Sequence, residues 1–195
     1  FLTVDQIGRS GSTFPYFDGG VSISRTARTY PTYLIFKPSM FLASALLIMY
    51  WIKTNNLINS YQKTEDVNNR FKTFGILSAI FLIIHSILLG VKFDYDLYKF
   101  FRRFVLLGFI IFEIVAQSLL VIKFYKLKSM IIKDINNYVL TLKIILVSIL
   151  VVVALFSLPI VVTSGNVHFK HALEWNYFVG VILFYLLTYL FWKKA

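Results

Sequence analysis

The chain has 195 residues, of which 58% are hydrophobic and 15% are charged, and its formal net charge is +11. Soluble domains carry roughly 25% charged residues, and a soluble protein of this size has too much surface for its volume to bury so many apolar side chains, so a soluble globular domain is excluded. Cysteine is absent, which excludes disulfides, thiol catalysis and cysteine-based metal sites.

The first 33 residues have the composition of an irregular segment. Glycine at positions 8, 11, 19 and 20 and proline at 15 and 31 oppose a regular helix. Aromatic residues such as Phe14, Tyr16 and Phe17 distinguish the segment from disordered tails, which are poor in aromatics. We therefore expect an ordered, non-cytoplasmic loop over 1–33. It either packs on another part of the protein or lies at the level of the lipid headgroups, where aromatic residues are favoured.

Five apolar segments follow, each close to the roughly 20 residues that a spanning helix needs. They cover residues 34–52, 73–91, 104–122, 139–163 and 172–192. Because backbone groups in hydrocarbon must satisfy their own hydrogen bonds, each span should be helical, and the short connectors place neighbouring helices antiparallel. The sequence therefore predicts an all-α fold, a polytopic transmembrane helical bundle over 34–195.

Lys and Arg are distributed unevenly among the connectors. The first and third connectors and the C-terminus carry ten, and the second and fourth carry five. Arg9, Arg25 and Arg28 in the N-terminal loop raise the second total to eight. The positive-inside rule then favours a C-terminus on the cytoplasmic or matrix side. An endomembrane or the plasma membrane is the favoured location, and the mitochondrial inner membrane is the alternative.

Polar side chains inside the spans are candidate functional residues, because their burial in hydrocarbon is costly. Glu113 and Gln117 are four residues apart and share a helix face. His85 lies deep in the second span, and His171 and Glu174 stand at the start of the fifth. One hypothesis joins these residues into a single intramembrane site for a proton, a metal or a lipid headgroup. The alternative, which we favour, is that they form packing contacts between helices.

One basic residue, Lys143, lies a turn inside the fourth span. Long basic side chains near the end of a span keep the aliphatic stem in hydrocarbon and extend the charged group to the membrane surface. The side chain of Lys143 is therefore able to extend its ammonium group toward the headgroups.

Motifs of catalysis are missing from the sequence. There is no G-x-S-x-G, no P-loop and no H-E-x-x-H. His168 and His171 are three residues apart but lack the accompanying spacing of a zinc site. The sequence therefore predicts a non-enzymatic protein with no catalytic residues, no cofactor and no resident metal.

Two stretches resemble a known family. Phe14-Pro15-Tyr16-Phe17-Asp18, followed by Ile23-Ser24-Arg25-Thr26-Ala27 and by Tyr30-Pro31-Thr32-Tyr33, is similar to the first luminal loop of the DRAM family of autophagy modulators and its relatives in GPI-anchor remodelling. His171-Ala172-Leu173-Glu174-Trp175 resembles the beginning of that family's last helix. The chain departs from the pattern at Arg25, where the family has an acidic residue, and in having five spans rather than six.

The resemblance implies a non-enzymatic role in membrane lipid organisation or in scaffolding lipid-processing machinery. It also implies six spans with both termini in the cytoplasm, the present chain supplying spans two to six and the first span preceding Phe1. Glu174 would be carried over as the acidic residue of the last helix. The residues expected to bind lipid headgroups, all in or beside the N-terminal loop, are Ser24, Arg25, Arg28, Tyr30 and Pro31.

Two other classes of function stay open. In an accessory subunit of a larger membrane complex, such as a respiratory one, the aromatic N-terminal loop would pack on a partner and no site would be needed. In a proton-linked carrier, Glu113 and His85 would bind the proton, although the spans lack the paired Gly/Pro interruptions typical of carriers. In every case the expected partners are membrane lipids and other membrane proteins, and nucleic acid is not expected.

Overall fold

The computed structural model describes residues 14–27, 31–62, 69–89, 95–162 and 165–193. Its five long helices are α3 (Thr32–Gln62), α4 (Arg70–Leu88), α5 (Asp96–Lys126), α7 (Asn137–Val162) and α8 (Val167–Phe191), and its one-turn helices are α1 (Pro15–Asp18), α2 (Ile23–Thr26) and α6 (Lys128–Ile131). All five long helices are long and apolar enough to cross a membrane. The predicted all-α bundle with five spans is confirmed, and the chain is a multi-pass integral membrane protein.

The long helices extend beyond some of the apolar segments that predict them. The first predicted span ends at residue 52, whereas α3 continues to Gln62 through the polar stretch that follows. Similarly, α5 begins at Asp96, ahead of the predicted start at 104. A hydropathy pattern marks the hydrocarbon layer, and a helix whose backbone bonds are already formed can continue into the headgroup region.

The described part of the N-terminal loop, 14–27, is not wholly irregular. It contains α1 and α2, each a single turn. Pro15 is suited to the first position of α1 because its missing N–H would have no partner there, and Gly19 ends the turn at φ +59°. The carboxylate of Asp18 accepts hydrogen bonds from the backbone N–H groups of Phe14 and Gly20, both at 2.7 Å. These short helices were not evident in the sequence, because residues such as Pro15 and Gly19 at their ends usually interrupt helices.

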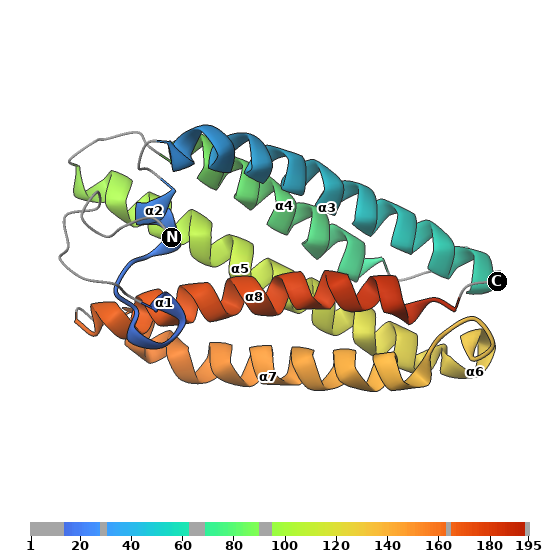
Figure 1. Cartoon of the computed structure of the whole chain (residues 1–195). Coiled ribbons are helices and arrows are strands. Elements are labelled where there is room, and N and C mark those ends of the chain that lie inside the picture. The colour runs from blue at the N-terminus through green and yellow to red at the C-terminus, as the bar shows by residue number, and fades with distance from the viewer. Residues whose placement is uncertain (1–13, 28–30, 63–68, 90–94, 163–164, 194–195) are drawn as a thin grey trace.

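The five long helices form a bundle in which helices that follow one another in the chain pack side by side (Figure 1). α3 packs on α4, α4 on α5, α5 on α7, and α7 on α8. α3 and α8 lie on the same face of the bundle but do not pack together as a helix pair. Their described contacts include Tyr50 of α3, whose ring lies 4.9 Å from that of Tyr185 and whose hydroxyl lies 3.4 Å from that of Thr188.

Large aromatic side chains fill one half of the bundle. Trp51, Phe71, Phe124, Phe184 and Phe191 are all buried in one hydrophobic cluster. The same end is tied by backbone bonds between the α6–α7 turn and the end of α8, from the N–H of Asn136 to Phe191 and from that of Lys193 to Asp134. Outward-facing apolar side chains remain exposed, for example Phe156 at 77%. Such a surface is expected where lipid surrounds the protein.

Proline stands inside two of the spanning helices, at Pro38 in α3 and at Pro159 in α7. A proline inside a helix removes one backbone hydrogen bond to the residue four positions earlier. In α3 this weak point lies in the half of the helix that precedes the aromatic cluster.

Gly75 sets how closely α3 and α4 approach. A β-carbon at this position would overlap the indole ring of Trp51. That ring is fully buried and also contacts Phe71, at 6.3 Å between ring centroids. Small residues at membrane helix interfaces allow this close approach of backbones.

We predict that Gly75→Ala lowers the free energy of unfolding by about 1–3 kcal/mol, as overpacking of a filled core does. The measurement is thermal unfolding of the purified protein in mild detergent. Adding Trp51→Phe should restore part of the loss, since the smaller ring leaves room for the methyl group. A Gly75→Ala variant as stable as the parent would contradict the close packing.

Candidate functional site

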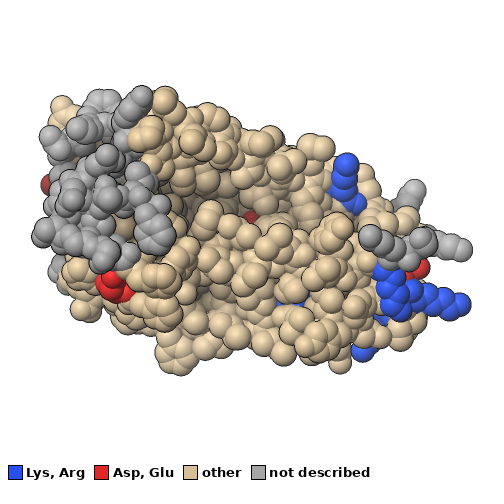
Figure 2. All heavy atoms as spheres, in the orientation of Figure 1, with Lys and Arg blue, Asp and Glu red and all other residues tan. Residues whose placement is uncertain are grey.

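A cavity of about 710 Å³ lies between α3 and α8, with its floor formed by α4 and α5. Figure 2 shows the surface hollowed between the two halves of the bundle. Leu46 and Ile182 line the cavity and are also exposed, at 55% and 40%. The cavity therefore opens sideways, toward the surrounding lipid. It exists because α3 and α8 face each other without packing together.

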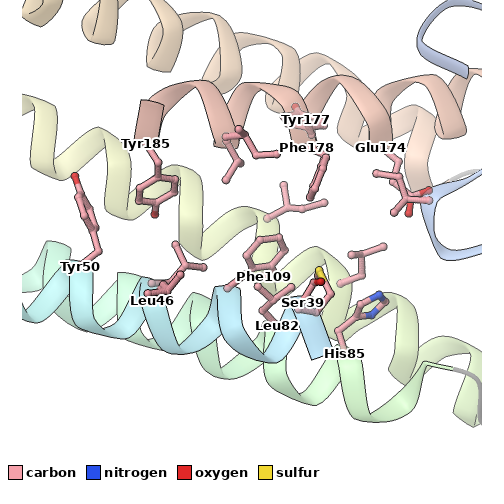
Figure 3. A pocket seen from close by; sticks show the side chains of 18 of the residues that line it. Ser39, Leu46, Tyr50, Leu82, His85, Phe109, Glu174, Tyr177, Phe178 and Tyr185 are labelled. Carbon is pink, nitrogen blue, oxygen red and sulfur yellow. The ribbon is translucent and has the colours of Figure 1, made fainter. Parts of the chain in front are cut away.

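Most of the cavity wall is apolar, and most of its polar side chains lie near the two ends (Figure 3). Tyr177 lies between the ends, and its hydroxyl donates to the carbonyl of Leu150. Near the N-terminal loop, whose Ile23 joins the wall, the end carries Ser39, His85 and Glu174. The opposite end, deeper in the bundle, carries the hydroxyls of Tyr50, Tyr185 and Thr188. An elongated molecule in this cavity would meet hydrocarbon along its middle and polar groups mainly at its tips.

Glu113 is fully buried behind the wall of the cavity. Its carboxyl Oε1 accepts hydrogen bonds from Gln117 Nε2, at 2.9 Å, and from the hydroxyl of Tyr185, and its Oε2 is 2.6 Å from the hydroxyl of Ser78. The predicted pairing of Glu113 with Gln117 on one helix face is thus present. Glu113 also joins α5 to α4 and α8.

The sequence reasoning missed Ser78 and Tyr185. Each is a hydroxyl in the middle of an apolar span, and such groups seek partners because hydrocarbon offers none. The signal was therefore present, but partner choice depends on which helices become neighbours, and the sequence alone does not specify this.

Lys143 does not extend to the headgroups, although its position near the end of the span would allow it. Its side chain is fully buried. The ammonium Nζ donates a 2.6 Å hydrogen bond to Thr188 Oγ1 and lies 4.0 Å from the ring centroid of Phe184 and 5.3 Å from that of Phe191. Aromatic faces attract cations. Lys143 stands on the side of α7 that faces α8. There the hydroxyl of Thr188 and the rings of Phe184 and Phe191 hold its charged group inside the bundle.

Thr188 connects the buried ammonium group to the cavity. Its hydroxyl donates to the carbonyl of Phe184 at 3.1 Å, which leaves its lone pairs for Lys143 and for the hydroxyl of Tyr50. Thr188 and Tyr50 both line the deep end of the cavity. The amino group of Lys143 therefore stands one side chain behind the cavity wall.

The other predicted polar residues lie elsewhere. His85 and Glu174 line the end of the cavity near the N-terminal loop. His171 instead bonds the carbonyl of Gly19 through Nδ1 at 2.9 Å, and this nitrogen must carry a proton because a carbonyl only accepts. The five residues predicted as one site are thus divided among three places. In the part of the chain that the structure describes, no group of three or more His, Asp or Glu side chains is placed to hold a metal.

The N-terminal loop packs on the first half of α8. Trp175 Nε1 donates to the carbonyl of Val21, and Asn176 Nδ2 donates to that of Tyr16, both at 2.9 Å. The rings of Tyr16 and Trp175 meet edge to face at 5.4 Å. Of the two sequence expectations for this loop, packing on another part of the protein is observed. The loop therefore lies over the end of the cavity where His85 and Glu174 stand.

Most residues predicted to bind lipid headgroups cannot be placed. Pro31 is exposed just before α3. The backbone of Ser24 and Arg25 belongs to α2, but their side chains lie outside the described part of the chain, as do Arg28 and Tyr30 altogether. The prediction of headgroup binding by this loop therefore stays a prediction.

Comparison of the chain with protein-family models, with curated proteins and with solved structures gives no match. The resemblance to the DRAM family thus also stays a prediction.

The hydrogen bond between Lys143 and Thr188 predicts opposite changes in stability when one or the other of these two residues is replaced. Thr188→Val leaves a buried ammonium group without its acceptor and should lower the free energy of unfolding by about 1–3 kcal/mol. Lys143→Met should be neutral or stabilising, because a buried charge is replaced by an apolar side chain of similar length. Thermal unfolding in detergent measures both.

The double variant Lys143→Met/Thr188→Val provides the control. It should be more stable than Thr188→Val alone, because no charge is left to lose its partner. A loss in Lys143→Met as large as that in Thr188→Val would show that the ammonium group is a net stabilising element, against this prediction.

Proposed function

We propose that the chain binds a membrane lipid or a related amphiphile in the cavity between α3 and α8, and acts without catalysis in the organisation of membrane lipids. The observation that carries the proposal is the cavity itself. Its volume of about 710 Å³ lies within the roughly 300–1,000 Å³ typical of ligand sites. Its wall is apolar, and it opens toward lipid.

The length of the cavity supports a ligand taken from one leaflet. Phe36 and Tyr50 are its first and last lining residues on α3. At 1.5 Å per residue they are roughly 21 Å apart along the helix axis, which is about two thirds of the ~30 Å hydrocarbon thickness of a bilayer. An acyl chain that enters from one surface would therefore reach the middle of the membrane or a little beyond it.

The distribution of polar groups supports the same class of ligand. Ser39, His85 and Glu174 stand at the end covered by the N-terminal loop, where the headgroup of an amphiphile would lie. The apolar wall between the ends suits an acyl chain. The resemblance of the N-terminal loop and of the start of α8 to the DRAM family favours this reading, including a role in scaffolding lipid-processing machinery.

Blocking the cavity should abolish lipid binding. Ala43 lines the cavity on α3, whereas Ala45, two residues further, is exposed and faces away from it. We predict that Ala43→Phe loses co-purifying lipid in native mass spectrometry, because the added ring occupies the cavity. Ala45→Phe adds the same ring toward the bilayer and should retain the lipid.

The two variants can also be tested for uptake from phosphatidylcholine vesicles after the co-purified lipid has been stripped. Equal lipid binding by Ala43→Phe and Ala45→Phe would rule out the cavity as the binding site. Thermal unfolding of both variants checks that the comparison is made between folded proteins.

We further propose that the end of the bundle with α6 faces the cytoplasm or the matrix, in an endomembrane or the plasma membrane or, alternatively, the mitochondrial inner membrane. Lys126, Lys128, Lys133 and Lys193 belong to the connector and tail at this end, and Figure 2 shows Lys and Arg side chains gathered there on the face in view. The positive-inside rule associates such clusters with the cytoplasmic side.

The absence of cysteine from the sequence makes this orientation testable by single substitutions. Ser129→Cys in α6 and Tyr95→Cys just before α5 are both at exposed positions at opposite ends of the bundle. In intact cells, for the plasma membrane, or in mitochondria without their outer membrane, for the inner membrane, a membrane-impermeant maleimide should label Tyr95→Cys and leave Ser129→Cys unlabelled until the membrane is opened. In sealed endomembrane vesicles, whose outer face is the cytoplasmic one, it should label Ser129→Cys and leave Tyr95→Cys unlabelled until the membrane is opened. The reverse pattern would invert the proposed orientation.

A further inference from the structure

The hydroxyl of Ser78 has two oxygen partners and only one proton. Its Oγ lies 2.8 Å from the carbonyl oxygen of Gly75 and 2.6 Å from Oε2 of Glu113. A serine hydroxyl donates one hydrogen bond and accepts others. If it donates to Gly75, the short contact with Glu113 needs a proton on the carboxyl group. A protonated Glu113 donating to Ser78 gives a hydrogen bond to each of these three oxygens, those of Ser78, Gly75 and Glu113 Oε2.

The surroundings of Glu113 also favour the neutral form. Its three hydrogen-bonding partners, Ser78, Gln117 and Tyr185, are all uncharged side chains in this network. The buried ammonium group of Lys143 is bonded to Thr188 instead. A carboxylate that is fully buried in a membrane span without a cation is strongly disfavoured.

We infer that Glu113 is a proton-binding site inside the membrane, protonated in the resting protein, and that its proton exchanges with the cavity through Tyr185. The hydroxyl of Tyr185 bonds Glu113, and Tyr185 also lines the cavity. Glu113 itself does not contribute to the cavity wall. Figure 3 shows Tyr185 at the deep end, facing Tyr50.

The exchange is a balanced proton relay. On uptake, the phenol of Tyr185 passes its proton to Oε1 of the Glu113 carboxylate and takes one from water or from an acidic group in the cavity, and the new carboxylic acid group then turns so that its O–H points to Ser78. On release, both transfers run in reverse. One proton enters the site and one carboxylate becomes a carboxylic acid, so no oxidant or other reactant is needed. The ligand of this site is the proton, and its occupancy does not depend on whether the cavity also binds lipid.

The other titratable groups near this region come from each neighbouring helix. α8 contributes Tyr185, α4 contributes His85 further along the cavity, and α7 contributes Lys143. Tyr50 of α3 stands beside Tyr185. Of these groups only Tyr185 is hydrogen-bonded to Glu113. A signal from Glu113 itself is therefore required to test the proposal.

Infrared spectroscopy supplies that signal, because a protonated carboxyl group has a C=O stretching band separate from that of a carboxylate. The sequence contains only three glutamates, Glu65, Glu113 and Glu174. In a Glu65→Gln/Glu174→Gln background labelled with ¹³C-glutamate, the isotope-shifted band comes from Glu113 alone. We expect a carboxylic acid band at neutral pH, which shifts when the buffer is exchanged for D₂O.

Tyr185→Phe tests the route, since it keeps the ring and removes the hydroxyl. The acid band should persist, and its exchange with D₂O should slow by roughly 100-fold, the lower end of what a positioned proton-transfer group contributes. Tyr189→Phe, a neighbouring lining residue that has no described bond to Glu113, should leave the exchange rate unchanged.

Stability gives a second readout. Glu113→Gln keeps both functions of the neutral acid, since its amide can donate to Ser78 and accept from Tyr185, and it should unfold at the same temperature as the parent. Absence of the Glu113 acid band at neutral pH would overturn the proposal. An unchanged D₂O exchange rate in Tyr185→Phe would overturn the route through the cavity. Neither outcome bears on lipid binding, which the Ala43 and Ala45 variants test separately.

Discussion

The structure depends on the requirement that polar groups in hydrocarbon find partners within the protein. Glu113 meets this requirement with one side chain from its own helix and one from each of two others, so that its carboxyl group fixes α4, α5 and α8 at a single level of the membrane. An apolar side chain gains nearly the same free energy from contact with another helix as from contact with lipid. Apolar contacts therefore do little to fix the level of one helix relative to another. A buried carboxyl group with three partners specifies it well, because displacing any helix leaves a polar atom without a bond.

A second polar contact, from Lys143 to Thr188, fixes α7 against α8. Together with the aromatic cluster around Trp51 and Phe124 it concentrates the tight packing in one half of the bundle. α3 shares in this packing only through its second half. Its first half packs on α4 and faces α8 across the cavity. The cavity is therefore a consequence of where the polar and aromatic contacts lie.

Much of this fold could be predicted from the sequence. Five apolar segments of spanning length determine five helices, and the spacing of Glu113 and Gln117 places them on one helix face. The burial of Lys143 could not be predicted, because a lysine one turn inside a span can point to either side of the helix. The partners of Tyr185, Thr188 and Ser78 could not be predicted either, since they come from helices that are distant in the sequence.

The cavity was likewise invisible in the sequence. Hydropathy reports which segments enter the membrane, but it contains no information on which pair of helices stays apart. The short helices of the N-terminal loop were missed because glycine and proline usually interrupt helices. The same residues can also stand at the beginning and end of a single helical turn. The aromatic content of that loop did indicate packing, and Tyr16 and Trp175 provide it.

The uneven support of α3 has a mechanical consequence. Beyond Tyr50 the helix is clamped by the buried indole of Trp51 and by Ile58, whereas before Tyr50 it rests on α4 along one flank only and contains Pro38. Such a helix behaves as a cantilever, fixed at one end and compliant at the other. A bulky ligand could enter the cavity if the segment 32–49 bent elastically away from α8 while the remaining helices stayed in place.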